Sequence, residues 1–229
     1  VSRGGFRNFK VKNIKIYDTY RSAITFAAVD GALIENIEVD GVRSIHTGNV
    51  IYLRIGDRWS AGKKPIMKNI TIKNVYAEIP MDKPDAGYNY EGPIEDLPRN
   101  ISPASIVGLP EYKIQNVTLQ NIEIVSPGGG NPYYAYRGLA PAELDSIPEM
   151  ATSYPEFSQF KELPAWGFYI RHAEGITFAN VTFKALKKDY RPAIVMDDAG
   201  EVTFKDVRFI EPEGEGKKQI FPYKSKVIK

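Results

Sequence analysis

Short segments in which apolar and polar residues alternate recur along the chain. Six of them align: KNIKIYD (12–18), ENIEVDG (35–41), KNITIKN (68–74), QNVTLQN (115–121), EGITFAN (174–180) and GEVTFKD (200–206). A period of two over so short a segment predicts a β-strand with one buried face. Asparagine is the second residue of the first four segments, and Asn, Asp or Gly follows five residues later in all six. These columns predict that the segments are copies of one structural unit.

A second predicted strand precedes most of these segments. It covers residues 22–31, 49–56, 104–110, 166–175 and 192–200, and three copies enter the next strand through a short turn ending in glycine. The unit is therefore strand, tight turn, strand and variable loop. Successive units start 23, 33, 47, 59 and 26 residues apart, and no helical segment separates the strands. A repeat of this length predicts a solenoid in which each unit buries its apolar face on its neighbours.

The predicted fold is all-β: a right-handed parallel β-helix with long loop insertions, formed as a single domain by residues 1–229. In stacked parallel coils, asparagines of one column can hydrogen-bond as a ladder along the stack. Asparagine also tolerates the left-handed backbone conformation that sharp corners require. A β-sandwich is the alternative that short alternating strands also allow. The asparagine columns favour the β-helix.

Three insertions interrupt the base period, at residues 56–66, 77–103 and 125–166. Loops this long in a compact fold are usually functional or disordered, and their many aromatic residues argue against disorder. Aromatic rings near arginines, such as Tyr90, Arg137 and Trp166, suit the binding of sugar rings and their carboxylates. The alternative is that the aromatic residues pack the loops onto the wall of the solenoid.

Composition excludes several classes of function. The formal net charge of +2 gives no basic field for nucleic acid, and no apolar run is long enough to span a membrane. Cysteine is absent, which excludes disulfides and thiolate metal sites. We find no phosphate-binding loop, metal-ligand cluster or nucleophile–base pair, so no cofactor and no metal is predicted.

Several longer stretches carry a family resemblance: YDTYRSAITF (17–26), GALIENIEVDGV (31–42), VIYLRIGDR (50–58), NVTLQNIEIVSPGGG (116–130) and DYRPAIVMDD (189–198). With these stretches the chain resembles the pectin-degrading, polygalacturonase-like glycoside hydrolases of family 28, in particular those of gut and soil Bacteroidetes. The resemblance implies metal-free hydrolysis of an acidic polysaccharide with inversion, by aspartates of an Asn-Thr-Asp motif and an Asp-Asp pair. It also implies that the protein is secreted or periplasmic.

The catalytic motifs of that family are missing from this chain. No Asn-Thr-Asp and no His-Gly occurs, and the strand that best matches the family's Arg-Ile-Lys carries Thr25 and Ala27 instead. The one Asp-Asp, Asp197-Asp198, lies at a turn near the end of the chain, where acidic residues are common. We therefore assign no catalytic residue. We expect this chain to be the C-terminal part of a longer β-helix whose missing N-terminal coils carry the catalytic acids.

The candidates for contact with a polysaccharide or oligosaccharide are chosen by charge, ring chemistry and position at strand ends or in insertions. They are Arg21, His46, Arg54, Arg58, Tyr90, Arg137, Trp166, Arg171 and His172. Arginine at the rim of a groove can bind a sugar carboxylate through two parallel hydrogen bonds. For Arg58 the alternative is an ion pair with Asp57 or another loop acid, and for the histidines it is a structural role.

Two other functions use the same fold. A binding module would keep the sugar groove without catalytic acids, and a polysaccharide lyase would need a basic residue and usually calcium held by acid clusters. Because no acid cluster lies on successive predicted strands, the lyase is the weaker alternative. Hydrolase and binding module stay open.

Overall fold

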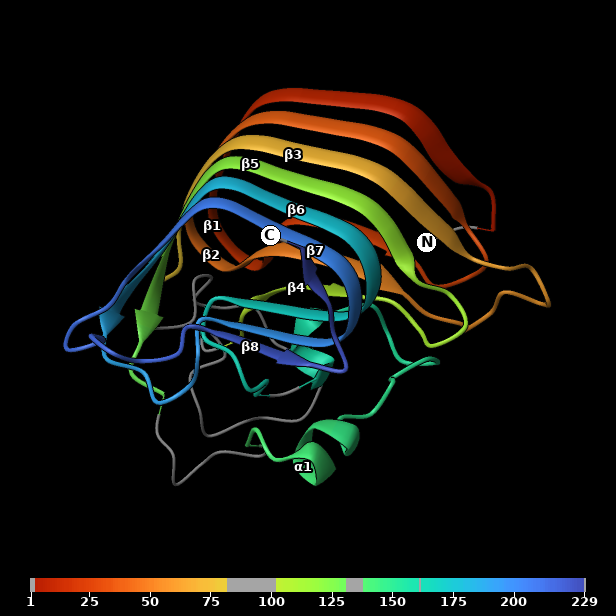
Figure 1. Cartoon of the computed structure of the whole chain (residues 1–229). Helices are drawn as coiled ribbons and strands as arrows, with labels where there is room; N and C mark the ends of the chain where they lie inside the picture. Colours follow the sequence, from red (N-terminus) through yellow and green to blue (C-terminus); the bar gives the residue numbers. More distant parts are fainter. Residues whose placement is uncertain (1–2, 82–101, 131–137, 161, 229) are drawn as a thin grey trace.

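The structure, a computed structural model, describes residues 3–81, 102–130, 138–160 and 162–228, and it is all-β with parallel strands (Figure 1). The strands are β1 (Gly5–Ala28), β2 (Leu33–Ile55), β3 (Ile66–Glu78), β4 (Ala104–Val107), β5 (Ile114–Gly128), β6 (Phe168–Lys187), β7 (Ile194–Ile210), β8 (Ile220–Tyr223) and β9 (Val227–Ile228). One short helix, α1 (Pro141–Asp145), and one 3-10 helix, η3 (Phe157–Phe160), lie between β5 and β6. None of the helices in this described part has the length and hydropathy needed to cross a bilayer.

The long strands curve and stack on one another in the order β1-β2-β3-β5-β6-β7, and the short β8 pairs with β7. Two of them bend enough to pair in two places: β2 pairs first with β3 and later with β4, and β6 pairs first with β4 and later with β5. The parallel pairings of β2, β3, β5, β6 and β4 therefore close into a ring, as in a barrel. The predicted parallel strands and the insertions between them are confirmed.

The predicted asparagine ladder is present at one bend of the stack. The side-chain amide of Asn36 donates to Asn8 at 3.0 Å, Asn69 donates to Asn36 at 3.0 Å, and Asn116 donates to Asn69 at 3.1 Å. All four residues have φ between 54° and 57°, which is the left-handed region. Asparagine adopts this region at lower cost than most residues, so the same side chain both permits the bend and joins neighbouring strands.

The alignment that we predicted for the first unit is wrong by five residues. We aligned residues 12–18 with residues 35–41, but Phe9 pairs with Ile37, and Asn8 rather than Asn13 is hydrogen-bonded to Asn36. The first period is therefore 28 residues rather than 23. The error arises because Asn8 and Asn13 are five residues apart. An alignment that is shifted by five residues therefore still places an asparagine opposite Asn36.

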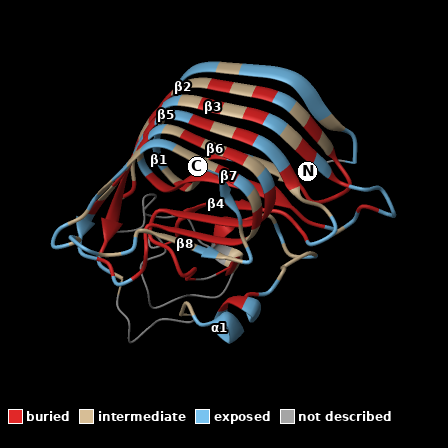
Figure 2. Ribbon diagram, in the orientation of Figure 1, coloured by how far each residue is buried: buried red, intermediate tan, exposed pale blue. Residues whose placement is uncertain are grey.

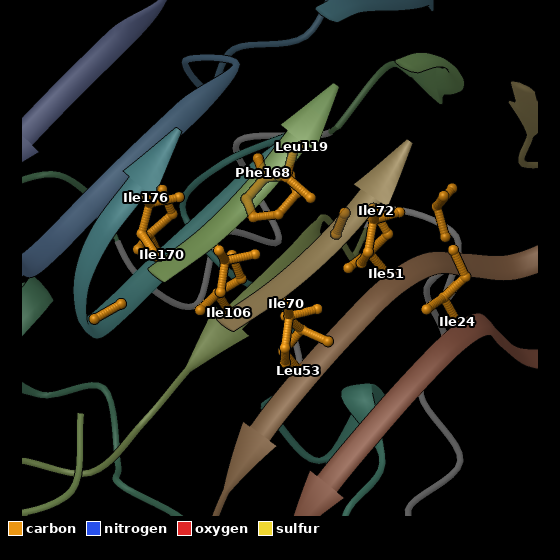
Figure 3. Close-up of a cluster of buried hydrophobic side chains, with 14 of the residues drawn as sticks. Ile24, Ile51, Leu53, Ile70, Ile72, Ile106, Leu119, Phe168, Ile170 and Ile176 are labelled. Atoms are coloured by element: carbon orange, nitrogen blue, oxygen red, sulfur yellow. The ribbon is translucent and has the colours of Figure 1, made fainter. Parts of the chain in front are cut away.

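The inward-facing side chains form one continuous apolar core inside the stack (Figure 3). Ile70 and Ile72 of β3 are buried there beside Leu53 and Ile51 of β2. Toward the last strands the core becomes aromatic, where Phe178 stacks on Phe204 with ring centroids 5.1 Å apart. Because a parallel register places like residues above one another, the apolar alternation of each strand becomes an apolar column.

A second apolar cluster covers the outer face of β2, β4, β6 and β7. On these strands the residues that point outward are also buried: Tyr52, Val107, Tyr169 and Val195. They pack against residues of the third insertion: Leu144, Ile147, Phe157, Phe160, Leu163 and Ala165. The described part of this insertion therefore folds back over the stack, and the prediction that its aromatic residues pack onto the wall is confirmed for Phe157 and Phe160.

The outermost strand, β1, is the most exposed of the stack (Figure 2). Its side chains that face the core are only partly covered: Ile14 is 37% exposed, and Phe9 nearby is 51% exposed. Val11 and Ile16 line an open apolar hollow at this end. Among the described strands, only β2 pairs with β1, so β1 is the edge strand of the described sheet.

Candidate functional site

Arg54 is buried beneath the third insertion, not at the rim of a groove as we predicted. Its side chain is 2% exposed, and it donates to the carbonyl oxygens of Gly108 at 3.3 Å and of Glu149 at 2.5 Å. The guanidinium also lies 5.1 Å from the ring centre of Phe160. Arg54 therefore joins β2 to the insertion, and burial lowers its pKa.

Arg171 of β6 holds the same insertion from a neighbouring strand. It donates to the carbonyl oxygen of Ile147 at 2.6 Å and forms an ion pair with Glu149 at 2.8 Å. Its Nε lies 3.1 Å from an oxygen of the buried Asp197, at an angle outside hydrogen-bond geometry, so this contact is an ion pair only. Because a buried charge is costly without a partner, these contacts fix the position of the insertion.

His172 lies between two carboxylates. Its Nδ1 is 2.7 Å from Asp198 of β7, and its Nε2 is 3.0 Å from Glu149. Lys113 adds a contact to the other oxygen of Asp198 at 2.8 Å. We call Glu149, His172 and Asp198 the carboxylate–histidine cluster.

The carboxyl groups here differ in their pKa values. Burial by itself raises the pKa of Asp198 and of Glu149. Hydrogen bonds and nearby positive charges, from Lys113 and His172 at Asp198 and from His172 and Arg171 at Glu149, together outweigh burial and lower the pKa of both carboxyls. The pKa of Asp197 is raised instead, because its burial outweighs the attraction of Arg171. A raised and a lowered carboxyl together are typical of acid–base catalysis. Asp197, however, is 3% exposed beneath the insertion, where no substrate can reach it.

The carboxylate–histidine cluster therefore serves to hold the insertion in place. Its accessible carboxyls, Glu149 and Asp198, are both ionised and both bound to His172, which leaves neither as a proton donor to a leaving group. Searched across the described ranges, groups of three or more His, Asp and Glu with metal-binding geometry are absent.

A second group of residues contains two exposed aromatic rings, and the guanidinium groups of Arg21 and Arg58 both lie near one of them, the ring of Tyr154. The guanidinium of Arg21 is 5.7 Å from the Tyr154 ring centre, and that of Arg58 is 5.5 Å from it. Arg58 also lies 3.8 Å from the ring centre of Trp59. Trp59 is 63% exposed and Tyr154 is 54% exposed. We call these four residues the aromatic–arginine patch.

Acidic residues fix both arginines of the patch. Arg21 forms an ion pair with the buried Glu156 at 2.5 Å. Arg58 donates to both oxygens of Asp30 at 3.3 and 3.2 Å, so the alternative that Arg58 pairs with a loop acid is confirmed. The Tyr154 segment is itself tied to the turn after β2, because the Asp57 amide donates to the carbonyl oxygen of Ala151 at 2.7 Å.

The remaining candidates lie elsewhere. Trp166 is 3% exposed and packs in the interior core, which leaves no ring face open to a sugar. His46 lies at a bend of β2 with φ 54°, where its Nδ1 is 3.2 Å from Asp18. Tyr90 and Arg137 lie outside the described residues. The predicted substrate role of His46 stays a prediction.

Sequence reasoning missed three residues of these two groups: Glu149, Trp59 and Tyr154. Glu149 stands between a proline and a methionine in an irregular stretch, with no periodicity to mark it. Trp59 could have been found, because a tryptophan directly after Arg58 in a polar turn has no strand face to fill. Tyr154 had only the general aromatic content of its insertion as a signal.

Comparisons with protein-family models, with curated proteins and with solved structures find no match to this chain. The resemblance to family 28 therefore stays a prediction, and the function has to be argued from the fold and the two groups of residues.

Proposed function

We propose that this chain belongs to a right-handed parallel β-helix that binds and hydrolyses an acidic, pectin-type polysaccharide, as its resemblance to family 28 implies. The long parallel strands β2 and β6, which each pair in two places along their length, and the asparagine ladders at the bends support a solenoid of successive coils. The same resemblance is the ground for proposing a secreted or periplasmic protein without metal or cofactor.

One observation supports a glycan as the ligand. Arg21 and Arg58, two arginines that the sequence marked for sugar binding, converge on the exposed ring of Tyr154. Aromatic rings provide a flat apolar surface for a sugar, and the two guanidinium groups, each paired with a protein carboxylate, hold that surface in place. Of the seven candidates that the structure describes, these two lie next to the exposed rings of Trp59 and Tyr154.

The catalytic carboxylates are the part of the proposal that the described residues do not supply. Inversion needs one protonated and one ionised carboxyl on opposite faces of the scissile bond, about 6.5–9.5 Å apart. Asp197 is enclosed, and Glu149 and Asp198 are ionised and bound to His172. We therefore propose that a further parallel coil, which carries the acids, stacks on the outer side of β1.

The exposed end of the stack supports that further coil. The partly covered Ile14 and the apolar hollow that Val11 and Ile16 line would be buried by another coil. Asn8, the last asparagine of its ladder, accepts from Asn36 and has its own amide to offer to a further residue. Full burial of a valine or isoleucine side chain stabilises a fold by about 1.5–3 kcal/mol, so covering these residues with an additional coil would stabilise the protein.

A reducing-end assay on de-esterified pectin tests the proposal, with a neutral glucan as the control. The experiment compares residues 1–229 with the product of the complete gene (the extended chain). Release of reducing ends from the acidic polymer by the extended chain supports the hydrolase. Binding without cleavage by both forms would identify a binding module instead, and neither binding nor cleavage would refute an acidic glycan as the ligand.

A further inference from the structure

The indole ring of Trp59 is held in place although it is largely exposed. Its exposed fraction of 63% is the largest among the big hydrophobic side chains of the described residues. Yet the Arg58 guanidinium lies 3.8 Å from its ring centre, and Asp30 holds that guanidinium through two contacts. The Trp59 carbonyl oxygen accepts from Arg3 at 2.9 Å. An exposed side chain held this firmly is typical of a binding surface, because the ring is ordered before the ligand arrives.

Tyr154 extends the same surface. Arg58 contacts Tyr154 as well as Trp59, so both exposed rings rest on one guanidinium group. The backbone bond from Asp57 to Ala151 and the ion pair of Arg21 with Glu156 connect the two segments on either side of the rings. Residues from two insertions, far apart in the sequence, therefore build one aromatic surface.

The charge around Trp59 is positive. Asp30 and Glu156 balance Arg58 and Arg21, so these pairs contribute little net charge. The exposed charged residues of the turn that carries Trp59 are Asp57, Lys63 and Lys64, and Arg3 donates to the Trp59 carbonyl oxygen, so three of these four residues are basic and one is acidic. A ligand that combines a flat apolar ring face with negative charge would match this surface.

We propose that the turn at residues 57–64 and Tyr154 together bind uronate residues of an acidic oligosaccharide. The C–H face of a sugar ring stacks on the outer face of the Trp59 indole, whose other face is covered by Arg58. The sugar carboxylate binds the ammonium groups of Lys63 and Lys64. This inference rests on the proposed function and adds the position of a sugar subsite and three residues that the sequence did not identify: Trp59, Lys63 and Lys64.

Quenching of tryptophan fluorescence by acrylamide tests the stacking. The chain has two tryptophans, the exposed Trp59 and the buried Trp166, so acrylamide quenches mainly Trp59. Tri- to hexamers of galacturonate should protect the wild-type protein from quenching. In Trp59→Ala the protection should disappear, and calorimetry should show at least tenfold weaker binding. Tyr17→Ala, which removes a 53% exposed aromatic ring of β1 outside the patch, should bind as the wild type does.

The double variant Lys63→Gln/Lys64→Gln tests the charge. It should bind galacturonate oligomers several-fold more weakly, and its affinity should depend less on salt than that of the wild type. The wild type and the double variant should not differ in their affinity for neutral gluco-oligosaccharides. If the wild type binds galacturonate and Trp59→Ala binds it equally well, this site is wrong while the proposed function stands. If the wild type binds no acidic oligosaccharide, both fail.

Discussion

Asn69 allows the physical reasoning behind the fold to be tested at one position. It lies in the middle of the asparagine ladder, donates to Asn36 at 3.0 Å and accepts from Asn116 at 3.1 Å. Its φ is 57°, in the left-handed region. Substitution by alanine removes both hydrogen bonds and places a Cβ atom in a conformation that disfavours it. Substitution by glycine removes the same hydrogen bonds without that penalty.

The expected magnitudes follow from these two terms. Two exposed amide hydrogen bonds contribute about 0.5 kcal/mol each, the lower end of the usual range. The left-handed conformation costs a residue such as alanine about 1–2 kcal/mol, which asparagine partly and glycine wholly avoids. We expect Asn69→Ala to lower the free energy of unfolding by about 2 kcal/mol and Asn69→Gly by about 1 kcal/mol.

The order of the two variants is the decisive result, because at an ordinary strand position glycine is the more destabilising residue. Urea denaturation followed by circular dichroism measures the stability of both variants. Their denaturation midpoints are compared with a common dependence of the free energy of unfolding on urea concentration. Gln120→Ala, a change at an exposed residue of β5, is the control and should stay within about 0.5 kcal/mol of the wild type. Glycine more destabilising than alanine at position 69 would refute the account of the bends.

Two further predictions concern the residues beneath the third insertion. Arg171→Met should destabilise the protein by about 3–5 kcal/mol because it leaves the buried Asp197 without its cation. In thermal denaturation, the double variant Arg171→Met/Asp197→Leu should recover most of this lost stability. No recovery would contradict the ion pair. The second prediction concerns pH. Lys113 and His172 lower the pKa of Asp198 in the folded state, although burial acts in the opposite direction. The contribution of Asp198 to stability is therefore present above its unfolded pKa of about 3.9 and is lost as the pH falls through its folded pKa. Asp198→Asn should therefore lose less stability than the wild type between about pH 5 and pH 2, and identical acid curves would contradict it.

Much of the fold can be predicted from the sequence because it depends on local features of the chain. The alternation of Ile70, Thr71 and Ile72 follows from the period of a strand, and the asparagine columns follow from the bends that each strand must make. The register of β1 could not be predicted from the sequence. Asn8 and Asn13 satisfy the same local rule, and only the pairing of Phe9 with Ile37 decides between them.

The candidate sites depended far more on tertiary structure. Composition and strand position were enough to select Arg21, Arg58, Arg171 and His172 as residues of interest. They could not show which of these would be covered, because that depends on how the third insertion folds back over β2, β4, β6 and β7. By itself the sequence determined a stack of parallel strands with asparagine at its bends. The tertiary structure alone decided that Arg171 and His172 are buried while Arg58 supports an exposed Trp59, because burial and charge pairing arise between segments that periodicity does not relate.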